Sequence, residues 1–137
     1  MQNFQEFLDI IQKLRSEQGC PWDKQQTILT MKEFILEEAQ EIVDAIEKKD
    51  NEELKEELGD LLLNILLIAQ IAKEQNLFTI EDVLISIKEK IIRRHPHVFG
   101  DVKVSSIEEI RDNWEKIKQQ EKQEKLDQLK FKQSQKI

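Results

Sequence analysis

The chain has 137 residues and a net charge of −7, enough length for one compact domain and too little for two of ordinary size. With 39% apolar residues in periodic clusters, it can bury a core, which excludes disorder throughout. Three glycines, two prolines and no tyrosine are too few turn residues for an all-β protein, so a few long helices are expected. The single cysteine, Cys20, excludes an internal disulfide and suits a reducing compartment.

The first half of the chain predicts two helices separated by a break. Residues 3–18 form the first, since apolar side chains recur there at helical spacing. The segment 19–23 interrupts it, because Gly19 can cap a helix and Pro21 cannot continue one. A second helix is expected from about Thr27 to Lys48. Its predicted core-facing residues are Ile28, Met31, Ile35, Ala39, Ile42 and Ile46.

Two further helices follow, each with a capping residue. Asp50 can cap a helix that runs to about Gln75, with Glu53 at the capping-box position. After Asp60 this helix is apolar nearly all round, which predicts that other helices or a second subunit cover it. The next begins at Thr79 and ends at His95-Pro96, because a residue before proline avoids the α region. Its predicted inward residues are Ile80, Val83, Leu84, Ile87 and Ile91.

The C-terminal part is expected to hold a loop, a last helix and a charged tail. Residues 98–104 are predicted as the loop, and Ser105 or Ser106 as the cap of the helix. The helix would bury Ile107, Ile110, Trp114 and Ile117. We predict one all-α domain over residues 1–120, a four- to five-helix bundle, and a tail over 121–137 that is a frayed helix or disordered.

Membrane insertion and secretion are not expected. The longest apolar run, residues 61–72, would span only about 18 Å as a helix, short of a bilayer core. The first residues, MQNFQEFLDIIQK, lack the basic start and cleavage site of a secretion signal. We therefore predict a cytoplasmic protein.

Acidic residues are concentrated in one part of the sequence. Residues 33–60 contain 12 acids and three lysines, a net charge of −9, while the remainder carries +2. On a helical wheel Glu38 lies about 60° from the centre of its helix's apolar face. In the following helix Glu53, Glu57, Asp60 and Asn64 share one face, which continues into buried apolar positions. These acids are therefore expected to point into a bundle.

The acidic residues predict a metal site. The connection around Lys49 and Asp50 is short, so the two helices should be antiparallel neighbours, with Glu38 and Glu41 opposite Glu57 and Asp60. Four close carboxylates repel one another unless a cation intervenes, and hard oxygen ligands suit Mg²⁺, with Mn²⁺ as a substitute. The alternative is a solvated acidic face. A di-iron centre is disfavoured, because neither histidine follows a glutamate at Glu-x-x-His spacing.

Four motifs carry a family resemblance, and the first of them consists of two segments. Residues 37–41 (EEAQE) and 57–60 (ELGD) resemble the EExxE…ExxD signature of the MazG family of nucleoside triphosphate pyrophosphohydrolases. Residues 19–23 (GCPWD), 93–99 (RRHPHVF) and 114–118 (WEKIK) look like the same family, in the same order, so that the resemblance covers about residues 4–120. It implies an all-α, usually homodimeric, Mg²⁺-dependent enzyme that converts a nucleoside triphosphate to monophosphate and pyrophosphate. The metal ligands carry over onto Glu38, Glu41, Glu57 and Asp60.

The remaining site residues are assigned by chemistry. Lys90 and Arg94 lie four apart on one helix, with Arg93 beside them, and can neutralise triphosphate oxygens; the alternative is favourable placement at a helix C-terminus. Trp22 and Trp114 can stack on a base or pack in the core. Lys118, in the last of the four motifs, is also assigned to substrate binding. Among the candidate catalytic residues Glu37, Glu38 and Glu41, either Glu37 or Glu41 can orient the attacking water, and the sequence does not choose.

The leading functional hypothesis is hydrolysis at the α–β phosphate bond, a housekeeping reaction of the nucleotide pool. No glycine-rich loop is present to hold β- and γ-phosphates as in kinases. The alternative is a non-catalytic helical module whose acidic face binds a basic partner. Nucleic-acid binding through the lysine-rich tail is disfavoured, because basic surface and interleaved aromatics are both lacking.

Overall fold

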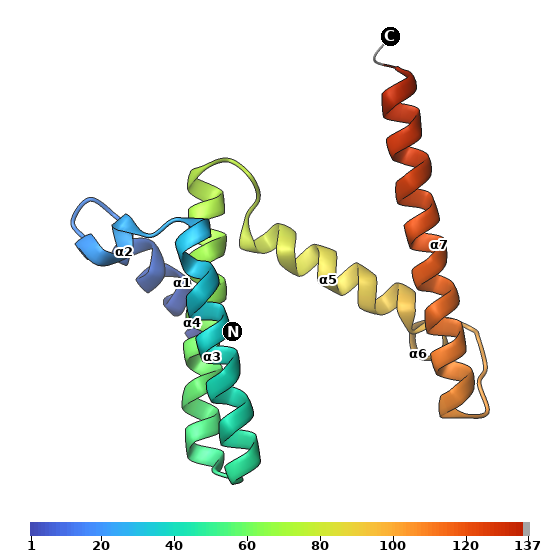
Figure 1. The fold of residues 1–137 in the computed structure, drawn as a ribbon, viewed down its shortest axis with the longest axis horizontal. Coiled ribbons are helices and arrows are strands. Elements are labelled where there is room, and N and C mark those ends of the chain that lie inside the picture. The colour runs from blue at the N-terminus through green and yellow to red at the C-terminus, as the bar shows by residue number, and fades with distance from the viewer. Residues whose placement is uncertain (136–137) are drawn as a thin grey trace. The chain divides into compact units, whose positions relative to one another are not determined.

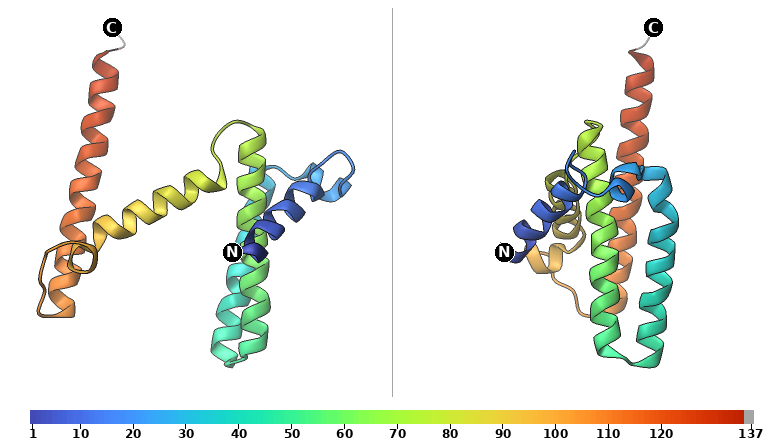
Figure 2. Two further views of the ribbon diagram at one scale, coloured as in Figure 1. Left: turned by 180° about the vertical axis from the view of Figure 1, so that it is seen from behind. Right: turned by 90° about the vertical axis from the view of Figure 1, so that its left-hand side faces the viewer.

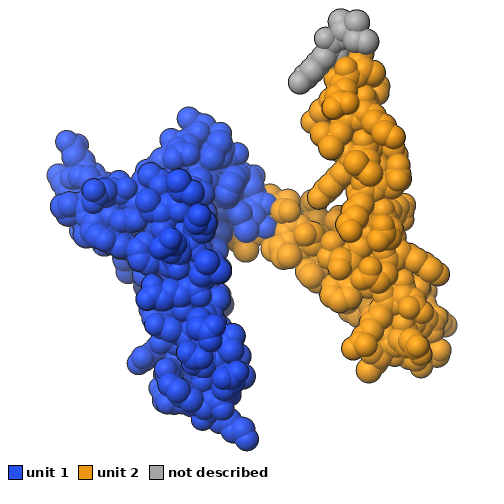
Figure 3. All heavy atoms as spheres, in the orientation of Figure 1, with its two compact units in different colours: residues 1–83 blue, residues 84–137 orange. Residues whose placement is uncertain are grey.

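The computed structural model describes residues 1–135, and within them seven helices and no strand. The all-α fold is as the sequence predicts. The chain divides into two compact units, residues 1–83 and 84–137 (Figure 3). Unit 1 contains α1 (Gln2–Leu14), α2 (Pro21–Gln25), α3 (Ile28–Lys48), α4 (Asn51–Glu74) and the first turn of α5 (Ile80–Arg94). Unit 2 contains the rest of α5, α6 (Pro96–Phe99) and α7 (Ile107–Ser134).

An antiparallel pair of long helices, α3 and α4, forms the centre of unit 1 (Figures 1 and 2). Thr27, near which α3 was expected to begin, caps that helix by exchanging hydrogen bonds with Thr30. The predicted cap of α4, the Asp50 side chain, accepts a hydrogen bond from the Glu53 backbone. Between them Lys49 adopts a left-handed conformation (φ 58°), which ends α3 and lets the chain reverse within two residues. The predicted short connection is therefore confirmed.

The core of unit 1 forms where α1 crosses α4. Its buried side chains come from three helices and are Ile11, Met31, Leu66, Leu67 and Ile71. The predicted apolar face of α1 packs against this cluster through Phe4, Phe7 and Leu8. The apolar residues that recur at helical spacing in α1 therefore pack against apolar side chains of the helices beside it.

Part of the predicted core of α3 is exposed. Met31 is fully buried, but Ile46 is 57% exposed and Ala39 is also exposed. The prediction was wrong for these two residues, because α4 and α1 cover only one side of α3. The same applies to α5, where Val83, Leu84, Ile87 and Ile91 are predicted inward and are exposed.

Two short helices were not predicted from the sequence. α2 occupies the segment expected only to break the first helix, and α6 covers Val98 and Phe99, which were assigned to a loop. Both start with proline at their first turn, where its fixed φ and missing N–H are tolerated. The sequence pattern identified the helix ends before these prolines and missed the helices that the prolines begin.

Unit 2 is organised around the junction of α5, α6 and α7. α5 ends at Arg94, as the His95-Pro96 pair predicts, and Ser106 caps α7. The ring of His95 lies 6.0 Å from that of Trp114, so α7 packs beside the end of α5. α7 continues to Ser134, and the boundary predicted after Gln120 therefore falls within a helix. The last two residues of the predicted tail, 136 and 137, lie outside the described residues.

Candidate metal centre

Four carboxylates converge between α3 and α4. Glu38 and Glu41 are one turn apart on α3, and Glu57 and Asp60 are one turn apart on α4. One oxygen of each lies within 4.8 Å of those of the others. Glu38, Glu41 and Glu57 are half-buried, and Asp60 is exposed. These are the four residues that the sequence predicts as ligands, brought together by the antiparallel packing of the two helices.

Within the described chain, the buried oxygens and the mutual repulsion of these four carboxylates are not fully compensated. One oxygen each of Glu38 and Glu57 is buried and accepts no hydrogen bond. Hydrogen bonding to Glu41, together with burial and the Glu38 carboxyl, raises the pKa of Glu57 to about 8. Burial raises the pKa of Glu38, and the charges of Glu41 and Asp60 add to the shift. A divalent cation would remove the repulsion and satisfy the orphaned oxygens.

The donor set fits a hard cation. Mg²⁺ and Mn²⁺ prefer carboxylate oxygens, and a site with these four ligands supplies only such atoms. A histidine-dependent centre does not fit, since His95 and His97 belong to unit 2 and their rings pair with each other at 5.6 Å. The described residues of unit 1 therefore carry a centre suited to Mg²⁺.

Asn64 fixes the helix pair next to the acids. It lies one turn beyond Asp60 on α4, is 8% exposed, and donates a hydrogen bond of 3.4 Å to the backbone oxygen of Phe34 on α3. Phe34 precedes Glu38 by one turn, so this bond ties α3 to α4 at the inner end of the cluster. In the sequence Asn64 lies on the acidic face of its helix, and no role was predicted for it. Its position on that face was the available signal that it contributes to the site.

The first glutamate of the EExxE segment, Glu37, lies outside the group of four converging carboxylates. Glu37 is exposed and is not among the four converging carboxylates. Its predicted role in orienting water stays a prediction, as does that of Glu41, which does belong to the group.

Trp22 is the predicted base-stacking residue of unit 1. It lies on α2, is 50% exposed, and meets the ring of Phe34 edge-on at 5.5 Å between centroids. Because Phe34 and Glu38 occupy the same face of α3, Trp22 presents an aromatic surface about one helical turn from the acid cluster. Arg15 holds this segment by donating hydrogen bonds to the backbone oxygens of Asp23 and Gln26.

The other predicted substrate residues gather in unit 2. Arg93 and Arg94 both pair with Glu121, at 2.7 and 2.9 Å. The Lys118 ammonium lies 5.6 Å from the centre of the Trp114 ring, which is 37% exposed. Lys90 lies one turn before Arg94 on α5 and is half-buried. Glu121 was missed because the predicted domain ended at Gln120; its position seven residues after Trp114 on one helix face was the signal.

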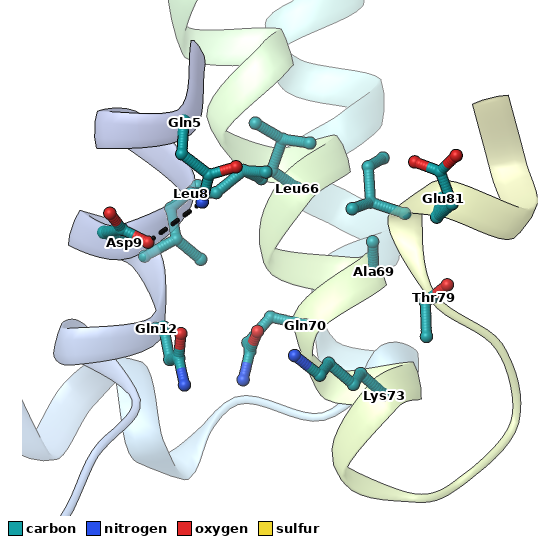
Figure 4. Close-up of a pocket in the computed structure, with 12 residues that line it drawn as sticks. Gln5, Leu8, Asp9, Gln12, Leu66, Ala69, Gln70, Lys73, Thr79 and Glu81 are labelled. Atoms are coloured by element: carbon teal, nitrogen blue, oxygen red, sulfur yellow. Dashed lines mark hydrogen bonds between the residues drawn. The ribbon is translucent and has the colours of Figure 1, made fainter. Parts of the chain in front are cut away.

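A cavity of about 310 Å³ lies elsewhere in unit 1 (Figure 4). It is bounded by α1, α4 and the start of α5, and its wall includes the polar side chains of Gln12, Gln70 and Lys73. None of the four converging carboxylates lines it. The candidate metal centre therefore lies between α3 and α4 and does not belong to this cavity.

Fold and site together define an all-α protein with a cluster of four carboxylates, a candidate metal centre, between two antiparallel helices. Residues 26–99 match the model of the MazG nucleotide pyrophosphohydrolase domain, and the chain belongs to that family. The match includes all four converging carboxylates and the Arg93-Arg94 pair.

Similar proteins extend over most of the chain. A Thermotoga maritima protein named nucleoside triphosphate pyrophosphohydrolase/pyrophosphatase MazG is 49% identical over 89% of this chain and 46% of its own length. The nucleoside triphosphate pyrophosphohydrolase of Escherichia coli K12 is 43% identical over 91% of this chain and 48% of its own. The Bacillus subtilis protein YabN is 50% identical over 87% of this chain and 24% of its own. The chain thus spans half or less of these relatives.

A solved structure shows the same fold. The crystal structure of a mazG-related protein from Thermotoga maritima superposes with a TM-score of 0.71 at 34% identity, covering 84% of this chain and 98% of that one. In the present structure, no helix of the described residues is both long and apolar enough to cross a membrane.

Proposed function

We propose that this chain hydrolyses nucleoside triphosphates to nucleoside monophosphate and pyrophosphate in a reaction that depends on Mg²⁺. The observation that carries the proposal is the convergence of Glu38, Glu41, Glu57 and Asp60 within 4.8 Å, with two buried oxygens that accept no hydrogen bond. Membership of the MazG family and the names of its relatives support the same activity.

The four carboxylates would hold the cation. When bound, Mg²⁺ would polarise a phosphate oxygen and lower the pKa of a bound water. Mn²⁺, which also prefers oxygen ligands, is expected to substitute. The proposed roles of the chain's own residues are to bind the cation, to place the triphosphate, and to receive a proton from the attacking water.

The bond broken in this proposal joins the α-phosphorus to the oxygen that bridges to the β-phosphate. Water adds to the α-phosphorus, and pyrophosphate leaves with the bridging oxygen and its electron pair. A carboxylate that is not fully engaged by the metal, Glu37 or Glu41, takes the proton of the water. The basic residues of unit 2, Lys90, Arg93, Arg94 and Lys118, are proposed to match the charge of the departing pyrophosphate.

Two further features belong to the proposal, namely the residues that contact the nucleobase and the oligomeric state. Trp22 and Trp114 are proposed to contact the nucleobase, since each presents a partly exposed ring. A homodimer or a larger homo-oligomer is proposed because α3, α4 and α5 expose rows of large apolar side chains. A nucleotide substrate also favours a cytoplasmic location, as the sequence predicts.

The test is a panel of nucleoside and deoxynucleoside triphosphates with Mg²⁺, with pyrophosphate and orthophosphate measured separately. Equal amounts of monophosphate and pyrophosphate are expected, with activity lost in chelator. In ¹⁸O-water the label should enter the monophosphate, because the water oxygen bonds to the α-phosphorus. Release of diphosphate with orthophosphate would overturn the proposal, and label found only in pyrophosphate would move the attack to the β-phosphorus.

The same assay addresses the alternative of a non-catalytic acidic module. Such a module would show no hydrolysis, no Mg²⁺ dependence, and salt-sensitive association with basic partners. The inward placement of Glu38 and Glu57 argues against it, since a docking face would keep its carboxylates solvated.

A further inference from the structure

A three-residue ion cluster in unit 2 joins the end of α5 to α7. Each oxygen of the Glu121 carboxylate accepts from a different arginine: Arg93 Nε donates to Oε1 at 2.7 Å, and Arg94 Nη2 donates to Oε2 at 2.9 Å. The side chains of Glu121 and Arg94 are 14% and 16% exposed, and that of Arg93 is 49% exposed. One carboxylate therefore bridges two neighbouring arginines in a largely desolvated place.

We propose that Glu121 is a positioning residue for the triphosphate: it holds Arg93 and Arg94 side by side so that their remaining N–H groups can bind phosphate oxygens. This inference rests on the proposed function, and it adds a residue beyond those assigned to the site from the sequence.

The number of N–H donors left on the two arginines indicates that Glu121 holds them in place and does not block them from binding an anion. A guanidinium has five N–H donors, and each arginine uses one of them on Glu121. A carboxylate that masked an arginine from substrate would be expected to take two parallel bonds from it. Glu121 divides its oxygens between two arginines, and this leaves both with donors to spare.

Charge also favours the holding role. Adjacent arginines repel each other, and a single carboxylate between them lowers this repulsion while leaving a net charge of +1 for an anion. The two guanidinium hydrogen bonds hold the pKa of Glu121 down, to about 2, so the carboxylate is ionised throughout the neutral range.

Arg94 is held in an imperfect environment. Its Nε is buried and has no hydrogen-bond partner among the described residues. An unsatisfied buried donor opposes folding, so Arg94 is poorly explained as a residue whose purpose is to stabilise the fold. Its placement is better explained by a ligand.

The neighbouring charges have other partners. Lys118 pairs with Glu115 at 3.6 Å and lies over Trp114, while Glu124 accepts a hydrogen bond from Gln120. Glu124 lines the same shallow cavity of about 330 Å³ as Arg93 and Glu121, without pairing with an arginine in the described structure. Glu124 therefore offers a matched control, one helical turn from Glu121.

The experiment compares Glu121→Gln with Glu124→Gln, which removes the same charge from the same helix. Binding of inorganic tripolyphosphate with Mg²⁺ is measured by calorimetry, and KM and kcat are measured with a nucleoside triphosphate. For Glu121→Gln we expect the dissociation constant and KM to rise on the order of tenfold with kcat little changed, as for loss of a hydrogen bond to a charged group. Glu124→Gln should leave both unchanged.

A second experiment, in a chain with both arginines replaced, distinguishes positioning of the arginines from a purely structural role of Glu121. In an Arg93→Gln, Arg94→Gln background, Glu121→Gln should cause no further loss of tripolyphosphate binding, because Glu121 acts through these arginines. An unchanged or lowered KM in Glu121→Gln would overturn the inference. So would an additional loss of tripolyphosphate binding when Glu121→Gln is added to the Arg93→Gln, Arg94→Gln chain.

Folding and the proposed function are separated by two further measurements. If Glu121→Gln does not fold, as judged by circular dichroism, Glu121→Asp shortens the side chain and keeps its charge; wild-type binding by a folded Glu121→Asp would overturn the inference. Failure of the wild-type chain to bind tripolyphosphate would also overturn it. Binding without hydrolysis of any nucleoside triphosphate would remove the proposed function and leave the role of Glu121 in anion binding standing.

Discussion

A carboxylate oxygen that is buried without a hydrogen-bond donor opposes folding, and Glu38 and Glu57 bring two such oxygens to one place. The charges of Glu41 and Asp60 add to the electrostatic repulsion on Glu38. At the scale of single residues, the stability of this helix pair and its capacity to bind a cation are therefore coupled: what destabilises the metal-free chain is what would bind Mg²⁺.

Glu38→Gln and Asp60→Asn are each expected to reduce turnover by more than about 100-fold while the fold is kept, because even outer-shell partners of metal ligands typically contribute 10–100-fold. Each substitution removes a ligand charge at nearly constant volume. Pyrophosphate release measures the effect, and circular dichroism checks the fold. Glu47→Gln, on the opposite face of α3, is the control that should keep full activity. A double variant with wild-type turnover would show that the cluster is only an acidic face.

Glu57 makes the stability of the metal-free chain depend on pH. Its pKa is raised from 4.5 to about 8 in the folded state, so the folded chain retains a proton that the unfolded chain loses over that range. Stability from this group is therefore fully present below pH 4.5 and falls as the pH rises through about 8.

The variant Glu57→Gln should weaken this pH dependence, because its side chain is neutral at every pH. Thermal unfolding in chelator between about pH 5 and about pH 9 measures the difference. With Mg²⁺ at about 100 times its dissociation constant, the wild-type chain should gain on the order of 10 °C in Tm, and Glu57→Gln much less. Identical pH profiles for the two chains would contradict the assigned shift.

At the scale of elements, one arginine fixes the position of a helix that periodicity could not find. The Arg15 side chain, 8% exposed, forms an ion pair with Glu74 at the end of α4 at 2.7 Å. It also donates to two backbone oxygens in the second half of the α2 segment, those of Asp23 within the helix and of Gln26 just after it. The placement of α2, and with it of Trp22, therefore depends on a side chain of the α1 C-cap.

Arg15→Met is expected to destabilise the chain by about 2 kcal/mol or more, because it removes a charged donor from two backbone oxygens and from the Glu74 carboxylate. Limited proteolysis should open the α2 segment first, and Trp22 fluorescence should shift. Glu74→Gln keeps both backbone hydrogen bonds of Arg15 and serves as the control, with a smaller loss of stability. Equal losses in the two variants would show that the ion pair, not the backbone contacts, holds α2.

At the scale of the whole molecule, long helices present more apolar surface than the described chain covers. Leu58, Leu62 and Ile65 of α4 are 51%, 39% and 41% exposed. α3 adds Leu29, Leu36 and Val43, spaced seven residues apart on one face. Single exposed leucines are ordinary, but rows along two adjacent helices are typical of surfaces that another chain covers.

We expect a homodimer or larger assembly in sedimentation at micromolar concentration, and a Tm that rises with protein concentration, because association stabilises the folded chain by mass action. A monomer with full activity and a concentration-independent Tm would contradict this prediction.

The sequence by itself determined the long helices, most of their ends and which four carboxylates converge in the candidate metal centre. Asp50, Thr79 and Ser106 act as caps where they were expected, because capping depends on contacts within three residues. Glu38, Glu41, Glu57 and Asp60 could be grouped because a two-residue turn leaves two helices little choice but antiparallel packing.

Only the tertiary structure decided which surfaces are covered and which distant residues meet. Ala39 and Ile46 follow the apolar period of α3, yet burial depends on whether another helix lies against that face. The pairs Arg15–Glu74 and Arg94–Glu121 join residues 59 and 27 positions apart, and no local pattern encodes such a contact. Periodicity and capping are short-range effects, whereas ion pairs between helices depend on packing that the chain adopts only as it folds.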